Sequence, residues 1–131
     1  MYRSLLTTRL QSAFGAAGIA LPPGFSVAVE LASDTRFGDY QSNAAMTLAK
    51  QLKTNPRALA EQIKAALVVE DVCSEVTIAG PGFLNFRIGT AALAAKVNAI
   101  VSSQDCDVAK VEAPKTIVID FSAPNIAKPM H

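Results

Sequence analysis

Apolar residues in the first hundred positions recur at spacings that predict helices and strands in turn. At the N-terminus they return every three or four positions, which predicts an amphipathic helix closed by Gly18. The positions that carry this period are Tyr2, Leu5, Leu6, Leu10, Ala13, Phe14 and Ala17. The same spacing predicts a helix capped by Ser42, a helix that begins at Pro56 behind Asn55, and a helix capped by Thr90.

Alternation of period two predicts the strands. Val27, Val29 and Leu31 alternate with Ala28 and Glu30, which predicts one half-buried strand.

Two further segments complete this part of the chain. Residues 73–88 are typical of a β-hairpin, because two extended runs flank the turn-forming Gly80-Pro81-Gly82. The stretch 33–41 has no period and holds polar turn formers, so we expect a loop there.

The end of the chain differs in pattern from the rest. Residues 103–115 are polar, mixed in charge and close on Pro114, as is typical of a linker. The run 116–121 (TIVIDF) is apolar on both faces apart from Asp120, which predicts a buried central strand of a parallel sheet. We therefore expect one domain over residues 1–102, a linker, and the first part of a second domain over residues 116–131.

Composition excludes several classes of function. The 131 residues include 12 basic and 11 acidic side chains, so the net charge of +1 excludes a histone-like mode of action. Any contact with nucleic acid must come from a local patch. Residues 36–64 hold five basic and two acidic side chains, a local balance of 5 − 2 = +3, which fits such a patch but equally fits a solvated helix face.

Other chemistry is limited by the residues present. No apolar run approaches the roughly 18 residues of a membrane span, so we expect no membrane contact. Cys73 and Cys106 are isolated from each other, which suits a reducing cytoplasm better than a disulfide framework or a metal site. The single histidine, His131, leaves no material for a histidine-based catalytic triad.

Phe83, Asn85 and Arg87 are the most informative residues of the hairpin. Strand alternation places them together on the face opposite Leu84 and Phe86, where we expect them to meet solvent. A ring that stacks on a base, an amide that reads its edge and a guanidinium that meets phosphate are typical of contacts to unpaired RNA. On pattern alone the alternative is open that Phe83 packs under the 33–41 loop while Asn85 satisfies turn amides.

Three motifs, taken together, resemble the N-terminal region of arginyl-tRNA synthetase, the class I arginine–tRNA ligase. They are FGDYQSN at 37–43, AGPGFLNFR at 79–87 and SAPNIAKPMH at 122–131. The resemblance covers essentially the whole chain. It implies an α+β domain, a small antiparallel sheet packed with helices, followed by the first strand of a Rossmann-like catalytic domain that breaks off at the His-x-Gly-His signature.

The resemblance also implies roles for individual residues. Phe83 and Asn85 match an aromatic and a polar residue that contact the D-loop at the tRNA elbow, with Arg87 beside them. Many relatives have tyrosine at the first position, so Phe83 keeps the stacking surface and lacks the hydroxyl. Ser122 and Asn125 match the arginine pocket. Lys128 matches a position near the ATP phosphates, and His131 the first histidine of the signature.

The function implied is that of a tRNA-binding part of a cytoplasmic enzyme that joins arginine to its tRNA with ATP and magnesium. We expect the 131 residues to bind no cofactor and to be inactive alone, because the remainder of the nucleotide-binding sheet is not in the sequence. A structural module that docks on a protein without RNA contact is the alternative.

Overall fold

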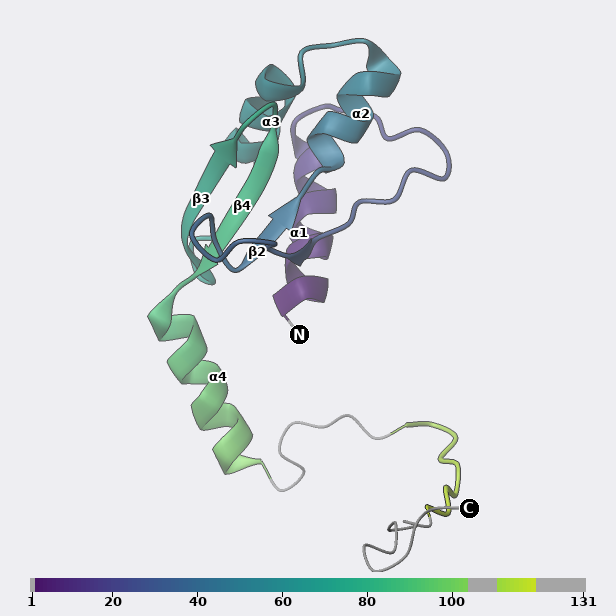
Figure 1. Ribbon diagram of the computed structural model, residues 1–131, viewed down its shortest axis with the longest axis vertical. Helices are drawn as coiled ribbons and strands as arrows, with labels where there is room; N and C mark the ends of the chain where they lie inside the picture. The colour runs from purple at the N-terminus through teal and green to yellow at the C-terminus, as the bar shows by residue number, and fades with distance from the viewer. Residues whose placement is uncertain (1, 104–110, 120–131) are drawn as a thin grey trace, which may run out of the picture.

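The computed structural model describes residues 2–103 and 111–119, and it contains four helices and a four-stranded antiparallel sheet in those ranges (Figure 1). The strand order is β1-β2-β4-β3, so the two strands of the hairpin are joined to two short strands from earlier in the chain. The elements are α1 (Tyr2–Ala16), β1 (Glu30–Leu31), β2 (Tyr40–Ser42), α2 (Ala44–Leu52), α3 (Pro56–Ala65), β3 (Cys73–Ala79), β4 (Phe83–Ile88) and α4 (Thr90–Ser102). The α+β class is confirmed.

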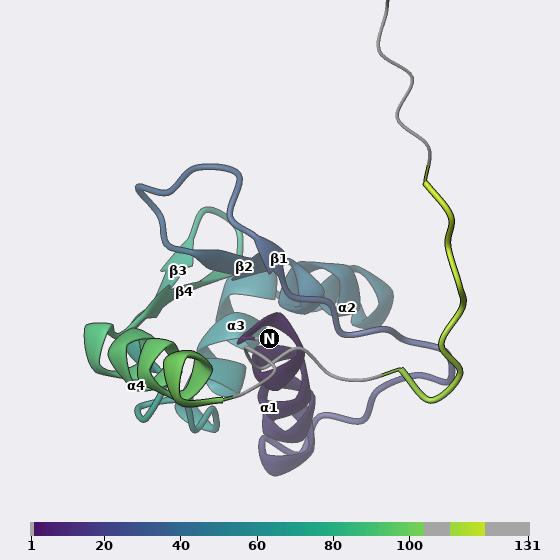
Figure 2. The same cartoon turned by 90° about the horizontal axis from the view of Figure 1, so that it is seen from below.

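The core lies between one face of the sheet and helices α1, α2 and α3, which gather on the same side (Figure 2). Leu84 and Phe86 of β4 point into it and are fully buried, as the alternation along the strand predicts. The fully buried side chains that meet them from the helices are Leu6, Leu10, Phe14, Leu48 and Ile63. We call this side of the sheet the inner face and the opposite side the outer face.

The start of α3 follows the predicted chemistry. The Asn55 side chain accepts hydrogen bonds from the backbone N–H groups of Arg57 (2.9 Å) and Ala58 (3.2 Å), and Pro56 is the first helical residue. The cap positions of the other two helices differ from the prediction. Asn43 rather than Ser42 holds the cap position of α2, although it is the Ser42 hydroxyl that accepts from the N–H of Ala44, the first residue of the helix, at 3.3 Å. Gly89 rather than Thr90 holds the cap position of α4.

The first predicted strand is shorter than expected. Only Glu30 and Leu31 pair in β1, because the backbone carbonyls before them are used by side chains. Ser42 Oγ donates to the carbonyl of Ala28 at 2.6 Å, and Arg3 Nε donates to that of Val29 at 2.9 Å. Leu31 is 70% exposed, although alternation places it on the same side as the buried Val29 and it pairs with Tyr40.

The predicted loop 33–41 is wrong at its C-terminal end. Tyr40 and Gln41 enter β2, which pairs with β1 on one side and with β4 on the other. The register places Gln41 opposite Asn85, 44 residues further along the chain. No local pattern encodes a pairing over that distance. The polar composition of residues 33–41 therefore predicted a loop where the structure has the start of a strand.

Helix α4 leaves the body of the domain (Figure 1) and has no buried residue. Its first turn is held by the Tyr2 hydroxyl, which donates to the carbonyl of Ala92 at 2.8 Å. Residues 116–119 lie in no strand and are exposed, so the buried strand expected at 116–121 is wrong for these four residues. A central strand needs a neighbour on each side, and the described ranges offer it none.

Candidate nucleic-acid interface

The outer face of the sheet carries rows of side chains fixed by strand register. Gln41 of β2, Asn85 of β4 and Thr77 of β3 are direct partners across three strands. Phe83 pairs with Ala79 in the next row toward the hairpin turn, and Arg87 pairs with Glu75 in the row beyond Asn85. The predicted sharing of one face by Phe83, Asn85 and Arg87 therefore follows from the ladder.

The loop that contains residues 33–39 lies on this outer face, away from the helices (Figure 2). Asp39 anchors it to β4 twice: its N–H donates to the carbonyl of Phe86 at 2.8 Å, and its carboxylate accepts from the N–H of Ile88 at 2.7 Å. Gly38 lies so close to β4 that a Cβ there would be 2.7 Å from the Phe86 carbonyl oxygen. The loop is thus attached to the strand that carries the candidate RNA-binding residues.

A pocket of about 270 Å³ opens between this loop and the sheet, and we call it the outer-face pocket. Its walls are two aromatic rings, two carboxamides, one hydroxyl and one methyl group. They come from Ser33, Phe37, Gln41, Ala79, Phe83 and Asn85. The pocket therefore brings together Phe83 and Asn85, as predicted, and adds Phe37 and Gln41.

We expected Phe83, Asn85 and Arg87 to meet solvent. This expectation is wrong for Asn85, which is 3% exposed, whereas Phe83 and Arg87 are half-buried. The reason is that β4 is a central strand, flanked by β2 and β3 and faced by the 33–39 loop. The Asn85 amide makes no hydrogen bond to any described residue. Every fully enclosed side-chain nitrogen or oxygen in the described ranges has a hydrogen-bond partner. The unpartnered Asn85 amide is therefore not fully enclosed, and it opens to the outer-face pocket that it lines.

Arg87 is directed to the loop rather than to free solvent. Its Nη2 donates to the carbonyl of Arg36 at 3.1 Å, and its Nε lies 3.9 Å from the carboxylate of Glu75. The neighbouring Arg36 is paired with Asp34, and the side-chain hydrogen bonds between the two lower the pKa of Asp34 and raise that of Arg36. The charge at this end of the face is therefore partly neutralised within the protein.

The opposite end of the face lies at the hairpin turn, beside the start of α3. Gly82 packs there so tightly that a Cβ would be 2.8 Å from the carbonyl oxygen of Pro56. Arg57 Nη1 donates to the carbonyl of Gly80 at 3.4 Å, which places an exposed guanidinium next to the turn that leads into Phe83. Lys50, Lys53 and Lys64 are exposed on the neighbouring helices and their junction.

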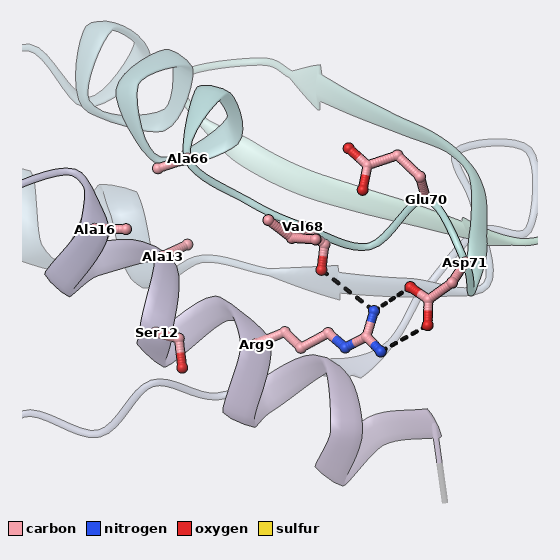
Figure 3. Close-up of a pocket in the computed structure, with 8 residues that line it drawn as sticks. All are labelled: Arg9, Ser12, Ala13, Ala16, Ala66, Val68, Glu70 and Asp71. Carbon is pink, nitrogen blue, oxygen red and sulfur yellow. Dashed lines mark hydrogen bonds and ion pairs between the residues drawn. The ribbon is translucent and has the colours of Figure 1, made fainter.

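A larger cavity of about 600 Å³ lies elsewhere, between α1 and the connection from α3 to β3 (Figure 3). Arg9 crosses it and is held by both carboxylate oxygens of Asp71 and by the carbonyl of Val68 at 3.3 Å. Hydrogen bonding to Asp71 raises the pKa of Arg9, and the guanidinium lowers that of Asp71. Because Arg9 and Asp71 satisfy each other, we assign this pair a structural role, in which it joins α1 to the connection between α3 and β3.

Several predicted residues cannot be placed. Ser122, Asn125, Lys128 and His131 lie outside the described residues, as does Cys106. Within residues 2–103 and 111–119, no three His, Cys, Asp or Glu side chains gather into a metal-binding group. None of the helices in those ranges is long and apolar enough to cross a membrane.

Phe37 and Gln41 were not singled out from the sequence as pocket residues. Both lie in the FGDYQSN motif, which is the one sequence feature that could have indicated them as pocket residues. The expectation of a loop at residues 33–41 gave no reason to place them beside β4. The register of β2 with β4 is what brings Gln41 beside Asn85.

Comparison with known proteins identifies the type of domain. The family described as arginyl tRNA synthetase N terminal domain matches residues 2–88. The arginine–tRNA ligase of Colwellia psychrerythraea is 40% identical over 134 residues, which cover 98% of this chain and 23% of that relative. The arginine–tRNA ligase of Thermosynechococcus vestitus is 51% identical over 100 residues, 76% of this chain and 17% of the relative.

Solved structures agree with the sequence comparison. The Thermus thermophilus arginyl-tRNA synthetase superposes on 79% of this chain with a TM-score of 0.62 and 26% identity, over 16% of its own length. The fold is thus that of the N-terminal domain of an aminoacyl-tRNA synthetase. The chain belongs to the arginyl-tRNA synthetase N-terminal domain family. It spans about a fifth of the length of the curated relatives it matches.

Proposed function

We propose that this chain serves as the tRNA-contacting part of an arginine–tRNA ligase, with the outer-face pocket as the contact site. The observation that carries the proposal is the juxtaposition of Phe83 and Asn85 in one pocket, with the Asn85 amide unpartnered and open to it. A ring and an amide side by side are suited to an unstacked base, which presents a flat face and a hydrogen-bonding edge.

The chemistry of the whole enzyme would lie elsewhere in the protein. We propose that it joins arginine to its tRNA with ATP and magnesium, and that the 131 residues do not catalyse this alone. Ser122 and Asn125 would contact arginine, while Lys128 and His131 would lie near the ATP phosphates. Cation and helix-terminal donors at such a site stabilise the negative charge that builds on the phosphates as the adenylate forms.

The domain division stays a prediction as well: a tRNA-binding domain over residues 1–102, a linker over 103–115 and the start of the catalytic domain over 116–131. The compartment we propose is the reducing cytoplasm. Both cysteines are isolated in the sequence, and Cys73 is a buried free thiol.

Titration of an arginine tRNA transcript against the 131-residue chain tests the RNA contact. NMR amide shifts detect weak binding, and a salt series separates RNA from protein partners, because phosphate contacts give an affinity that falls steeply with salt. We expect shifts in β4, β2 and the 33–39 loop, and weaker binding by Phe83→Ala. Val68→Ala is the control, because Val68 is exposed and lines the cavity of Figure 3 instead.

A full-length enzyme that carries this domain gives a second readout. There Phe83→Ala is expected to raise KM for tRNA while KM for arginine and ATP stays the same. Equal loss for all three substrates would contradict the proposal. Shifts on the outer face that appear with a protein partner and not with tRNA would favour the docking module.

A further inference from the structure

We propose that one side of helix α4 is a docking surface for the remainder of the longer enzyme, and that α4 thereby fixes strand β4 relative to it. The surface consists of Leu93, Val97, Ile100 and Val101, and we call it the α4 stripe. The inference rests on the proposed place of this chain in an arginine–tRNA ligase. It does not depend on the RNA contact itself.

The α4 stripe holds all the large apolar side chains of the helix. Their spacing of i, i+4, i+7 and i+8 confines them to an arc of about 100° at 3.6 residues per turn, whereas the other positions hold small or polar residues. In a folded domain such a stripe normally faces the core. Here Leu93, Val97 and Val101 are 43%, 56% and 79% exposed, and α4 has no buried residue. The described part of the chain therefore does not bury the stripe.

The length of α4 gives a second reason to expect a partner. The helix has 13 residues and one charged side chain, Lys96. Isolated helices of about 12–15 residues are marginally stable in water, and most helices in proteins are stabilised by the packing of an apolar face. A partner that covers the α4 stripe would supply that packing.

The size of the stripe favours a partner on the same polypeptide over a separate molecule. A 13-residue helix is about 20 Å long and about 10 Å wide, so one side of it covers a few hundred Å². Stable interfaces between separate proteins bury about 800 Å² on each partner. A tethered partner needs less area, because a short linker gives it an effective concentration in the millimolar range.

The relatives indicate which tethered partner is available. This chain spans about a fifth of the arginine–tRNA ligases that it matches. Helix α4 extends away from the body of the domain (Figure 1), and the predicted linker over residues 103–115 follows it directly. The catalytic part of the enzyme, which we propose begins after that linker, is thus the occupant to which we assign the stripe.

The connection between β4 and α4 is short and fixed. Gly89 alone separates the two elements, and its N–H donates to the carbonyl of Val72 at 2.8 Å. The Tyr2 hydroxyl donates to the carbonyl of Ala92, in the first turn of α4, at 2.8 Å. Because these bonds hold the start of α4 against the domain, a body docked on the α4 stripe would also set the position of the strand that carries Phe83.

Hydrogen exchange of the α4 amides, followed by mass spectrometry, tests the inference in the 131-residue chain and in a full-length enzyme that carries this domain. Exchange is expected to be slower in the full-length enzyme by on the order of tenfold or more, the factor that corresponds to burial of one or two valine-sized side chains. Val97→Gln should restore fast exchange in the full-length enzyme. In the 131-residue chain it should leave exchange unchanged, because Val97 is already exposed there.

Ala95→Gln is the matched control. Ala95 is exposed on the opposite side of α4 and receives the same new side chain, so the full-length variant should keep slow exchange. KM for tRNA gives a second readout. Val97→Gln should raise it in the full-length enzyme and leave the tRNA affinity of the 131-residue chain unchanged, since the substitution alters the position of β4 and none of its residues. Circular dichroism shows whether each variant folds.

Three results would overturn the docking surface. They are equally fast α4 exchange in the two proteins, equal effects of Val97→Gln and Ala95→Gln, and α4 protection that appears in the 131-residue chain as its concentration rises, which would assign the stripe to a second copy. An unchanged KM for tRNA in the Val97→Gln enzyme would overturn the positioning of β4. Slow α4 exchange in an enzyme whose tRNA binding is indifferent to Phe83→Ala would refute the proposed function and support the docking surface.

Discussion

Gly38 lies against Phe86: a Cβ at position 38 would be 2.7 Å from the Phe86 carbonyl oxygen, and the backbone of Gly38 has a φ of +150°. The same carbonyl accepts the N–H of Asp39 at 2.8 Å. Glycine is required here on two grounds, the space and the backbone conformation. The contact fixes the loop that carries Phe37 to the strand that carries Asn85.

Gly38→Ala is therefore expected to destabilise the domain by about 2 kcal/mol, because strained backbone conformations cost on the order of 1–3 kcal/mol before any clash is counted. Urea unfolding followed by circular dichroism measures the change. Gly15→Ala in α1 is the matched control, since nothing lies within 4 Å of a Cβ there and alanine favours a helix. Equal stability of the two variants would contradict the close approach.

Phe86 and Phe83 lie three residues apart on opposite faces of β4, and their removal should have different effects. Phe86 is fully buried in the core, so Phe86→Ala should cost about 3–5 kcal/mol of unfolding free energy. Phe83 is half-buried at the outer-face pocket, so Phe83→Ala should cost much less stability and act mainly on tRNA affinity. Parallel urea unfolding of both variants checks the ranking, which a larger loss for Phe83→Ala would reverse.

Asn55→Ala should cost about 1 kcal/mol, because it leaves the N–H groups of Arg57 and Ala58 without their acceptor. Asn43→Ala is the paired control. Asn43 holds the equivalent position of α2 and its side chain makes no capping hydrogen bond. Thermal unfolding should show a clearly lower Tm only for Asn55→Ala, and similar shifts for both variants would rule out the capping role.

The Arg9–Asp71 pair should contribute stability that depends on pH in the acid range. The pKa of Asp71 is lowered by its hydrogen bond to Arg9, so the folded state favours the ionised carboxylate. Its contribution is fully present above the ordinary aspartate pKa of about 3.9 and is lost as the pH falls through the lower folded value. Urea midpoints of the unmodified chain and Asp71→Asn should differ at about pH 6, where the carboxylate is ionised, and should converge as the pH falls below the ordinary aspartate pKa of about 3.9. A constant difference would contradict the assignment.

Cys73 should be unreactive in the folded protein. Burial raises its pKa to about 11, so the thiolate that reacts with alkylating reagents is scarce near neutral pH. In a Cys106→Ser background, iodoacetamide labelling should be slow until urea unfolds the chain. The raised pKa also predicts that stability falls as the pH rises past about 8.5, where the unfolded thiol ionises. Rapid labelling of the native chain would show that the thiol is accessible.

Local patterns predicted much of the fold correctly. The helix at the N-terminus, the Asn55-Pro56 start of α3, the hairpin over residues 73–88 and the helix after Gly89 each depend on residues within a few positions of one another. Periodicity also placed Leu84 and Phe86 on the inner face and Phe83 and Asn85 on the outer one, because alternation is a property of the strand itself.

By itself, then, the sequence determined the type of each long element, the family and which residues of β4 share a face. Only the tertiary structure decided that Tyr40 and Gln41 form a strand, that Leu31 is exposed, and that Asn85 is buried under a loop yet left without a partner. The physical reason is sequence separation. The pairing of Gln41 with Asn85 and the packing of Gly38 on Phe86 join segments more than forty residues apart, which no local period encodes.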